Sequence, residues 1–200
     1  APMDDPHHAR NAAACALAMS RRLDALNEEW RRAAEAAGRP YFPVRCGIGL
    51  ATGPCCVGNL GSDQRLEYSC LGDDVNLASR IEGATKSMRS DVLVSEATRQ
   101  AAGTLAFLEA DVLKLKGKSQ ASQLYLLAGN GDFATSEAFA ALKARHDDMM
   151  AHIAAGDHEA ALACATALEH EAPERLSRFY SLYAERCRDA LSGPTAAEAP

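Results

Sequence analysis

The chain has 200 residues, a formal net charge of −6 and a hydrophobic fraction of 48%, enough for one domain, or for one domain and a small appendage. The negative charge and the absence of a block rich in lysine and arginine argue against nucleic acid as the main partner. No apolar run is long enough to cross a membrane and no secretory signal opens the chain, so we expect a cytoplasmic location and no membrane contact from this segment. The first residue is alanine, which leads us to expect a piece of a longer protein and leaves open whether that parent is anchored to a membrane.

The cysteines are odd in number, 7, and no pair of them has a spacing typical of a metal site. Neither a disulfide framework nor a zinc site fits this pattern. We therefore expect reduced, mostly buried thiols of a cytosolic domain at Cys15, Cys46, Cys55, Cys56, Cys70, Cys164 and Cys187.

A long alanine-rich helix is predicted over residues 9–37, after a polar lead-in. Its larger apolar residues recur at alternating spacings of three and four, which gives one continuous stripe. The stripe consists of Ala16, Met19, Leu23, Leu26 and Trp30. We expect this stripe to pack into the core, and we expect Gly38 and Pro40 to end the helix.

Residues 44–51 alternate in polarity and predict a half-buried strand. Its inward-facing residues are expected to be Val44, Cys46, Ile48 and Leu50. A turn at 52–54 then leads into a second short strand and a glycine-rich loop. The glycine spacing fits neither of the common phosphate-binding loops, so we expect these glycines to permit close packing and tight turns.

Residues 65–88 predict a short strand, a turn at Gly72 and an amphipathic helix that Asp73 is expected to cap. One helical stripe, expected to be buried, is Leu77, Ile81, Ala84 and Met88; a second stripe at the same spacing is Asn76, Arg80, Gly83 and Ser87. An amide and a permanent cation therefore stand one turn apart, beside the strand end that carries Ser69. On spacing alone, such a pair is typical of a solvated helix face.

Residues 91–127 predict a strand at 91–95, a short helix that Ser95 caps, and a hairpin over 105–127. Three lysines, Lys114, Lys116 and Lys118, alternate along one face of the hairpin. Lysines in this arrangement usually provide solvation or protect a sheet edge.

The rest of the chain predicts a linker at 129–135, a helical hairpin-like tail at 136–192 and disorder at 193–200. Offsets of small residues in the tail resemble one tetratricopeptide-type helical hairpin, which is too little for a solenoid and is expected to cap the domain or to mediate association. The tail histidines lack the spacing of a ligand pair and are expected at the surface: His146, His152, His158 and His170.

The string YSCLGDDVNLASRIEG, at residues 68–83, resembles the signature helix of the class III nucleotide cyclases, the adenylate and guanylate cyclases. The segment LKGK with its returning LYLL strand is similar to the same family, and the resemblance covers about residues 1–127. It implies an α+β fold with a ferredoxin-like mixed sheet that is incomplete at the N-terminus, in a partial catalytic domain at 1–128 followed by the all-α tail. It also implies the conversion of ATP to 3′,5′-cyclic AMP and pyrophosphate.

The resemblance assigns roles to four residues of this chain. Asn76 is expected to position the ribose, and Arg80 to stabilise charge in the transition state. Lys116 is expected to reach the terminal phosphates. Ser69 occupies the position that reads the purine, where adenylate cyclases of the family have aspartate or threonine and guanylate cyclases have cysteine. Because serine is closest to threonine, ATP is favoured over GTP as the substrate.

The family's two metal-binding aspartates and its base-selecting lysine lie on strands before the residue equivalent to Ala1, and Asp4 and Asp5 do not replace them. We therefore assign no metal ligand in this chain and expect the ligands of Mg²⁺ or Mn²⁺ upstream of it. The resemblance implies that residues 1–200 alone are inactive, and that the parent is a homodimer with active sites shared between subunits. Without the central strands the chain is expected to expose a sheet edge and an apolar helix face. The alternative is a non-catalytic, cyclase-like dimerisation or regulatory module.

Overall fold

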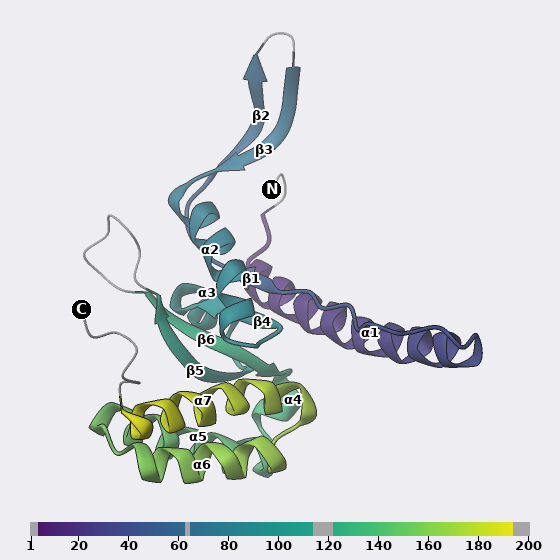
Figure 1. The fold of residues 1–200 in the computed structure, drawn as a ribbon. Helices are drawn as coiled ribbons and strands as arrows, with labels where there is room; N and C mark the ends of the chain where they lie inside the picture. Colours follow the sequence, from purple (N-terminus) through teal and green to yellow (C-terminus); the bar gives the residue numbers. More distant parts are fainter. Residues whose placement is uncertain (1–3, 63–64, 114–121, 194–200) are drawn as a thin grey trace, which may run out of the picture.

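The computed structural model describes residues 4–62, 65–113 and 122–193 and has the expected α+β architecture (Figure 1). Its elements in chain order are α1 (His8–Ala36), β1 (Ile48–Leu50), β2 (Cys56–Ser62), β3 (Arg65–Leu71), α2 (Asp73–Ser87), β4 (Val92–Ser95), α3 (Glu96–Ala102), β5 (Ala106–Leu113), β6 (Ser122–Gly129), α4 (Gly131–Ala134), α5 (Glu137–Ala155), α6 (His158–Glu171) and α7 (Glu174–Ser192). The expected linker thus contains a short helix, α4, and the expected disorder at the C-terminus lies outside the described residues.

The main sheet has four strands in the order β1-β4-β6-β5. Strand β1 pairs in parallel with β4, and the other two pairings are antiparallel, so the sheet is mixed as predicted. Strands β2 and β3 form a separate antiparallel hairpin that projects away from the main sheet (Figure 1). The ferredoxin-like arrangement stays a prediction.

Successive residues of the sheet strands point to opposite faces, and this alternation divides the core in two. On one face, Val92 and Val94 of β4 pack with the N-terminal part of α1 and with α3. On the other face, Leu93 of β4 packs in a cluster that includes the buried side of α2 and helices α5 and α7. The helical tail, meaning α5, α6 and α7, therefore shares a hydrophobic core with the sheet.

The prediction for α1 is correct in extent but wrong in packing. Its buried residues are Ala9, Ala13, Ala16, Leu17 and Ser20, all in the first half of the helix. Two residues of the predicted core stripe are largely exposed, Met19 at 55% and Trp30 at 43%. The second half of α1 extends beyond the sheet (Figure 1), so the apolar stripe continues past the point where the described chain offers a packing surface.

The strand predicted at 44–51 is shorter than expected. Only Ile48–Leu50 pairs with another strand. Val44 and Cys46, expected to face inward, are exposed, because residues 41–46 run along α1 instead. Asn27 of α1 holds this segment with two hydrogen bonds, donating to the Val44 carbonyl oxygen at 2.8 Å and accepting from the Val44 amide at 2.9 Å.

Most cysteines are exposed, so the prediction of buried thiols is wrong. All 7 are free; only Cys187 is buried, and Cys164 is half-buried. Cys55, Cys56 and Cys70 belong to the projecting hairpin and its base, where the described chain provides no second layer to cover them.

The prediction that all tail histidines lie at the surface is wrong for His146. This side chain of α5 is fully buried, with 0% exposure. Its Nε2 donates to the backbone carbonyl of Glu109 in β5 at 2.8 Å, and its Nδ1 lies 3.2 Å from the Tyr180 hydroxyl of α7. Desolvation of the imidazole lowers the pKa of His146 to about 4. His146 is thus a neutral hydrogen-bonding link between the tail and the sheet.

Candidate functional site

Helix α2 carries two of the predicted site residues. The N-cap residue is Gly72, so Asp73 is the first helical residue and not the cap that the sequence predicted. Both Asp73 and Asp74 lie in the first turn, where carboxylates interact favourably with the positive end of the helix dipole. The predicted buried stripe is confirmed: Ile81 and Met88 are buried and Leu77 and Ala84 pack partly against the same core.

The opposite face of α2 is open. Asn76 and Arg80 are both exposed, one turn apart on this face. No hydrogen bond or ion pair joins either side chain to another residue of the described part of the chain. A carboxamide and an unpaired guanidinium are therefore available to a ligand that carries hydroxyl and phosphate groups.

Ser69 lies on β3, which runs through Gly72 directly into α2. It is exposed and stands opposite Gly58 of β2, where a Cβ would meet nothing within 4 Å. The structure therefore brings Ser69 to the base of the hairpin, next to the start of the helix that carries Asn76. Lys116 lies outside the described residues, between the end of β5 and the start of β6.

Helix α2 is held close to β1 by glycine. A Cβ added to Gly49 would lie 2.2 Å from the Glu82 amide nitrogen and 2.5 Å from the Ala78 carbonyl oxygen, both backbone atoms of α2. Helix backbone cannot yield as the end of a flexible side chain can. The close approach that Gly49 permits is thus to the site helix and not to a neighbouring strand.

We expect Gly49→Ala to displace α2 and to lower the free energy of unfolding by about 1–3 kcal/mol, the range typical of overpacking. Urea unfolding followed by circular dichroism measures this change. Gly58→Ala is the matched control, because its Cβ enters open space. An equal loss in both variants would show that strand glycines matter here through backbone freedom and not through the contact with α2.

The resemblance to the cyclases implies a divalent metal ion as the cofactor of the reaction. No group of three or more histidine, cysteine, aspartate or glutamate side chains is placed to hold a metal ion in residues 4–62, 65–113 and 122–193. Mg²⁺ binds through carboxylate oxygens and water in octahedral geometry. We therefore assign no metal ligand among them.

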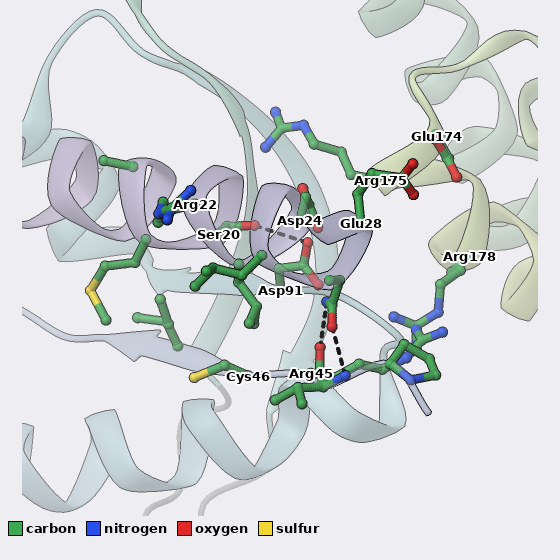
Figure 2. A pocket seen from close by; sticks show the side chains of 18 of the residues that line it. Ser20, Arg22, Asp24, Glu28, Arg45, Cys46, Asp91, Glu174, Arg175 and Arg178 are labelled. Carbon is green, nitrogen blue, oxygen red and sulfur yellow. Dashed lines mark hydrogen bonds between the residues drawn. The ribbon is translucent and has the colours of Figure 1, made fainter. Parts of the chain in front are cut away.

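A pocket of about 1200 Å³ lies elsewhere, between α1, residues 41–48 and the start of α7 (Figure 2). Its lining is mainly apolar, with Leu23 and Leu26 of α1 among it, and its rim carries both carboxylates and arginines. Ser20 donates to Asp91 at 3.1 Å on one side, and partial burial raises the pKa of Asp91. None of Ser69, Asn76 and Arg80 lines this pocket, so it is separate from the candidate site.

Large apolar side chains are exposed in the segment that precedes β1. Phe42 is 79% exposed and Val44 50%, in the segment that runs beside the exposed half of α1. Strand β1, at the edge of the main sheet, has a paired neighbour on one side only among the described residues. In the part of the chain that the structure describes, no helix is both long and apolar enough to span a membrane.

Comparison with known proteins gives several relatives that are named as adenylate cyclases. The chain is 41% identical over 130 residues to adenylate cyclase 1 of Rhizobium meliloti, a match covering 64% of this chain and 19% of that protein. It is 33% identical over 115 residues to an adenylate cyclase of Anabaena cylindrica, covering 55% of this chain and 22% of the relative. The chain thus spans about a fifth of the length of these two relatives.

Solved structures of nucleotide cyclases are also similar to this chain. The crystal structure of the guanylyl cyclase Cya2 matches with a TM-score of 0.55 and 30% identity, covering 66% of this chain and 64% of that one. The adenylyl cyclase CyaB from P. aeruginosa matches with a TM-score of 0.50 and 32% identity, covering 60% and 58%. The family model for the adenylate and guanylate cyclase catalytic domain matches residues 1–129, so the chain belongs to that family.

Proposed function

We propose that this chain supplies the ribose- and phosphate-binding part of an adenylate cyclase that converts ATP to 3′,5′-cyclic AMP and pyrophosphate in intracellular signalling. The observation that carries the proposal is the open face of α2, where Asn76 and Arg80 stand one turn apart beside the strand of Ser69, within the region that matches the cyclase family. Relatives named as adenylate cyclases support the reaction class.

In the proposed reaction the ribose 3′-hydroxyl gives its proton to water as its oxygen attacks the α-phosphorus. A new P–O bond closes the ring, and the bond between the α-phosphorus and the pyrophosphate oxygen breaks. Asn76 orients the ribose by hydrogen bonding, because a carboxamide both donates and accepts. Arg80 stabilises the negative charge that develops on the phosphate oxygens, because its planar, permanently charged fork matches their geometry. Both residues hold and polarise the substrate without exchanging protons with it.

Ser69 and Lys116 complete the proposed substrate contacts. The Ser69 hydroxyl reads the purine edge, and its likeness to threonine favours adenine over guanine. Lys116 neutralises the terminal phosphates, for which a compact cation on a flexible stem is suited.

The proposal keeps the metal ligands upstream of Ala1, where the resemblance to the family implies them, and assigns none of the described residues to the metal. Mg²⁺ or Mn²⁺ supplies activation of the attacking hydroxyl and charge neutralisation when bound. The proposal therefore includes a cytoplasmic homodimer with shared active sites, and residues 1–200 alone are expected to be inactive.

A second candidate is a non-catalytic, cyclase-like dimerisation or regulatory module. The observation in its favour is that several large apolar side chains of α1 and of the segment beside it are exposed, namely Met19, Trp30, Phe42 and Val44.

The test measures cyclic nucleotide production from ATP and from GTP, with Mg²⁺ or Mn²⁺, and compares residues 1–200 with a form extended upstream. The proposal expects cyclic AMP from the extended form, little cyclic GMP, and no product from the short one. An extended form that dimerises but stays inert with both nucleotides would favour the module instead. Activity of the short form would refute the assignment of the metal site.

A further inference from the structure

Helix α2 ends in an unusual way at Arg89. The Ser90 amide donates to the Thr85 carbonyl at 3.0 Å and the Arg89 amide to the Lys86 carbonyl at 3.3 Å, which is the Schellman pattern of a helix terminus. This pattern requires a left-handed residue, normally glycine, and Arg89 has a φ of 50°. It is the one non-glycine residue with positive φ in the described part of the chain. Strain of this kind persists where neighbouring structure fixes the residue.

The side chain of Arg89 is fixed by the helical tail. Its Nη1 donates to Oε1 of Glu185 at 2.9 Å and its Nη2 to Oε2 of Glu185 at 2.6 Å, a two-pronged contact with α7. The next residue of α7, Arg186, places its Nη2 3.7 Å from the sulfur of Met88, the C-cap residue of α2. Helix α7 therefore contacts both residues that end the site helix.

Helix α7 is in turn attached to β5. The Tyr183 hydroxyl donates to the Ala110 carbonyl oxygen, and Arg186 pairs with Asp111 at 3.2 Å. His146 adds its hydrogen bond to the Glu109 carbonyl from α5. Tyr180 and Phe179 are fully buried beneath these contacts. The tail thus forms a fixed support that reaches from β5 to the end of α2.

We propose that the helical tail positions the cyclase helix α2 through the contact between Arg89 and Glu185. Glycine at position 89 would end the helix without strain, but it would remove the ion pair between the end of α2 and Glu185 of α7. The family model matches residues 1–129, which include Arg89 but not Glu185. The contact therefore joins the catalytic domain to a helix that lies outside the matched region. Its effect on catalysis rests on the proposed function, whereas the attachment itself does not.

The attachment is tested by hydrogen–deuterium exchange of residues 1–200. Glu185→Ala and Arg89→Gly are expected to speed exchange of the amides at 84–90 by about two- to five-fold, the range for a partly exposed ion pair. The double variant should exchange no faster than either single one, because both remove the same contact. The control is Arg145→Ala, which breaks the pair between Arg145 and Glu171 within the tail. Side-chain exposure is 40% and 60% in that pair and 35% and 46% in the tested one.

Arg89→Gly separates positioning from stability. Because glycine relieves the left-handed strain, the midpoint of thermal unfolding should stay the same or rise while exchange at 84–90 still accelerates. Unchanged exchange in both single variants would overturn the proposal, and so would acceleration equal to that of the Arg145→Ala control.

In a form that makes cyclic nucleotide, Arg89→Gly is expected to lower kcat by about ten-fold at unchanged KM, since a small displacement of Asn76 and Arg80 weakens transition-state contacts. Faster exchange with unchanged kcat would overturn the positioning role. If the form extended upstream, with wild-type sequence at position 89, makes no cyclic nucleotide, the proposed function fails, and the exchange experiment alone decides whether α7 fixes α2.

Discussion

Arg80→Ala is expected to lower kcat for cyclic nucleotide formation by about 10²- to 10³-fold, the loss typical of removing one stabilising donor from a charged transition state. The guanidinium is exposed and unpaired within the described chain, so its removal leaves no orphaned carboxylate and little structural damage. The measurement is kcat and KM in the extended form, with circular dichroism to verify folding.

Two further variants identify the property of Arg80 that matters. Arg80→Lys keeps the charge but loses the planar fork, so an intermediate loss is expected. Ser79→Ala is the control: it removes the exposed side chain next to Arg80 in α2 and should leave kcat unchanged. A rate for Arg80→Ala equal to that of Ser79→Ala would exclude Arg80 from the site and weaken the cyclase proposal as a whole.

Acid is expected to loosen the tail from the sheet through His146. Above pH 6.5 the imidazole is neutral in both the folded and the unfolded chain. As the pH falls from 6.5 towards 4, the unfolded chain takes up the proton while the folded chain does not, because the folded pKa is lowered to about 4. The free energy of unfolding should therefore fall by up to about 3 kcal/mol over this window and change little further below it.

Urea unfolding at a series of pH values measures this loss. In His146→Gln the amide can still donate to the Glu109 carbonyl but takes up no proton in this range, so the pH dependence between 6.5 and 4 should flatten. His170→Gln, at an exposed position, serves as the control and should keep the wild-type slope. A wild-type slope in His146→Gln would place the acid-sensitive group elsewhere.

The elements were predictable from the sequence wherever one local pattern decided them. The stripe through Ile81 and Met88, the Ser95 cap of α3 and the helical character of the tail each follow from residues a few positions apart. The Ser95 side chain indeed accepts from the Thr98 amide at 3.2 Å. The open face of α2 with Asn76 and Arg80 was predictable for the same reason, because a helix that buries one stripe of side chains exposes the opposite one.

The errors arose where burial depends on a distant neighbour. A periodic stripe identifies the apolar face of α1, but only the fold determines that Trp30 lies beyond the sheet. His146 lacked a ligand spacing, yet Tyr180 and Glu109 meet it from other elements. The contact between Arg89 and Glu185 joins residues 96 positions apart, and no local pattern distinguishes that arginine from a solvated one.

The projecting hairpin has a consequence for how the protein discriminates between nucleotides. Strands β2 and β3 pair only with each other in the described chain, and a two-stranded ribbon alone is marginally stable in water. Ser69 sits on this ribbon, whereas Asn76 and Arg80 sit on a helix packed into the core. The residue proposed to select the base therefore lies on a less stable element than the residues proposed to act on the ribose and phosphates. The proposed selectivity for ATP over GTP would then depend on the surface that the β2–β3 hairpin contacts in the assembled protein. Conditions that disorder this hairpin would remove the selectivity before they remove the activity.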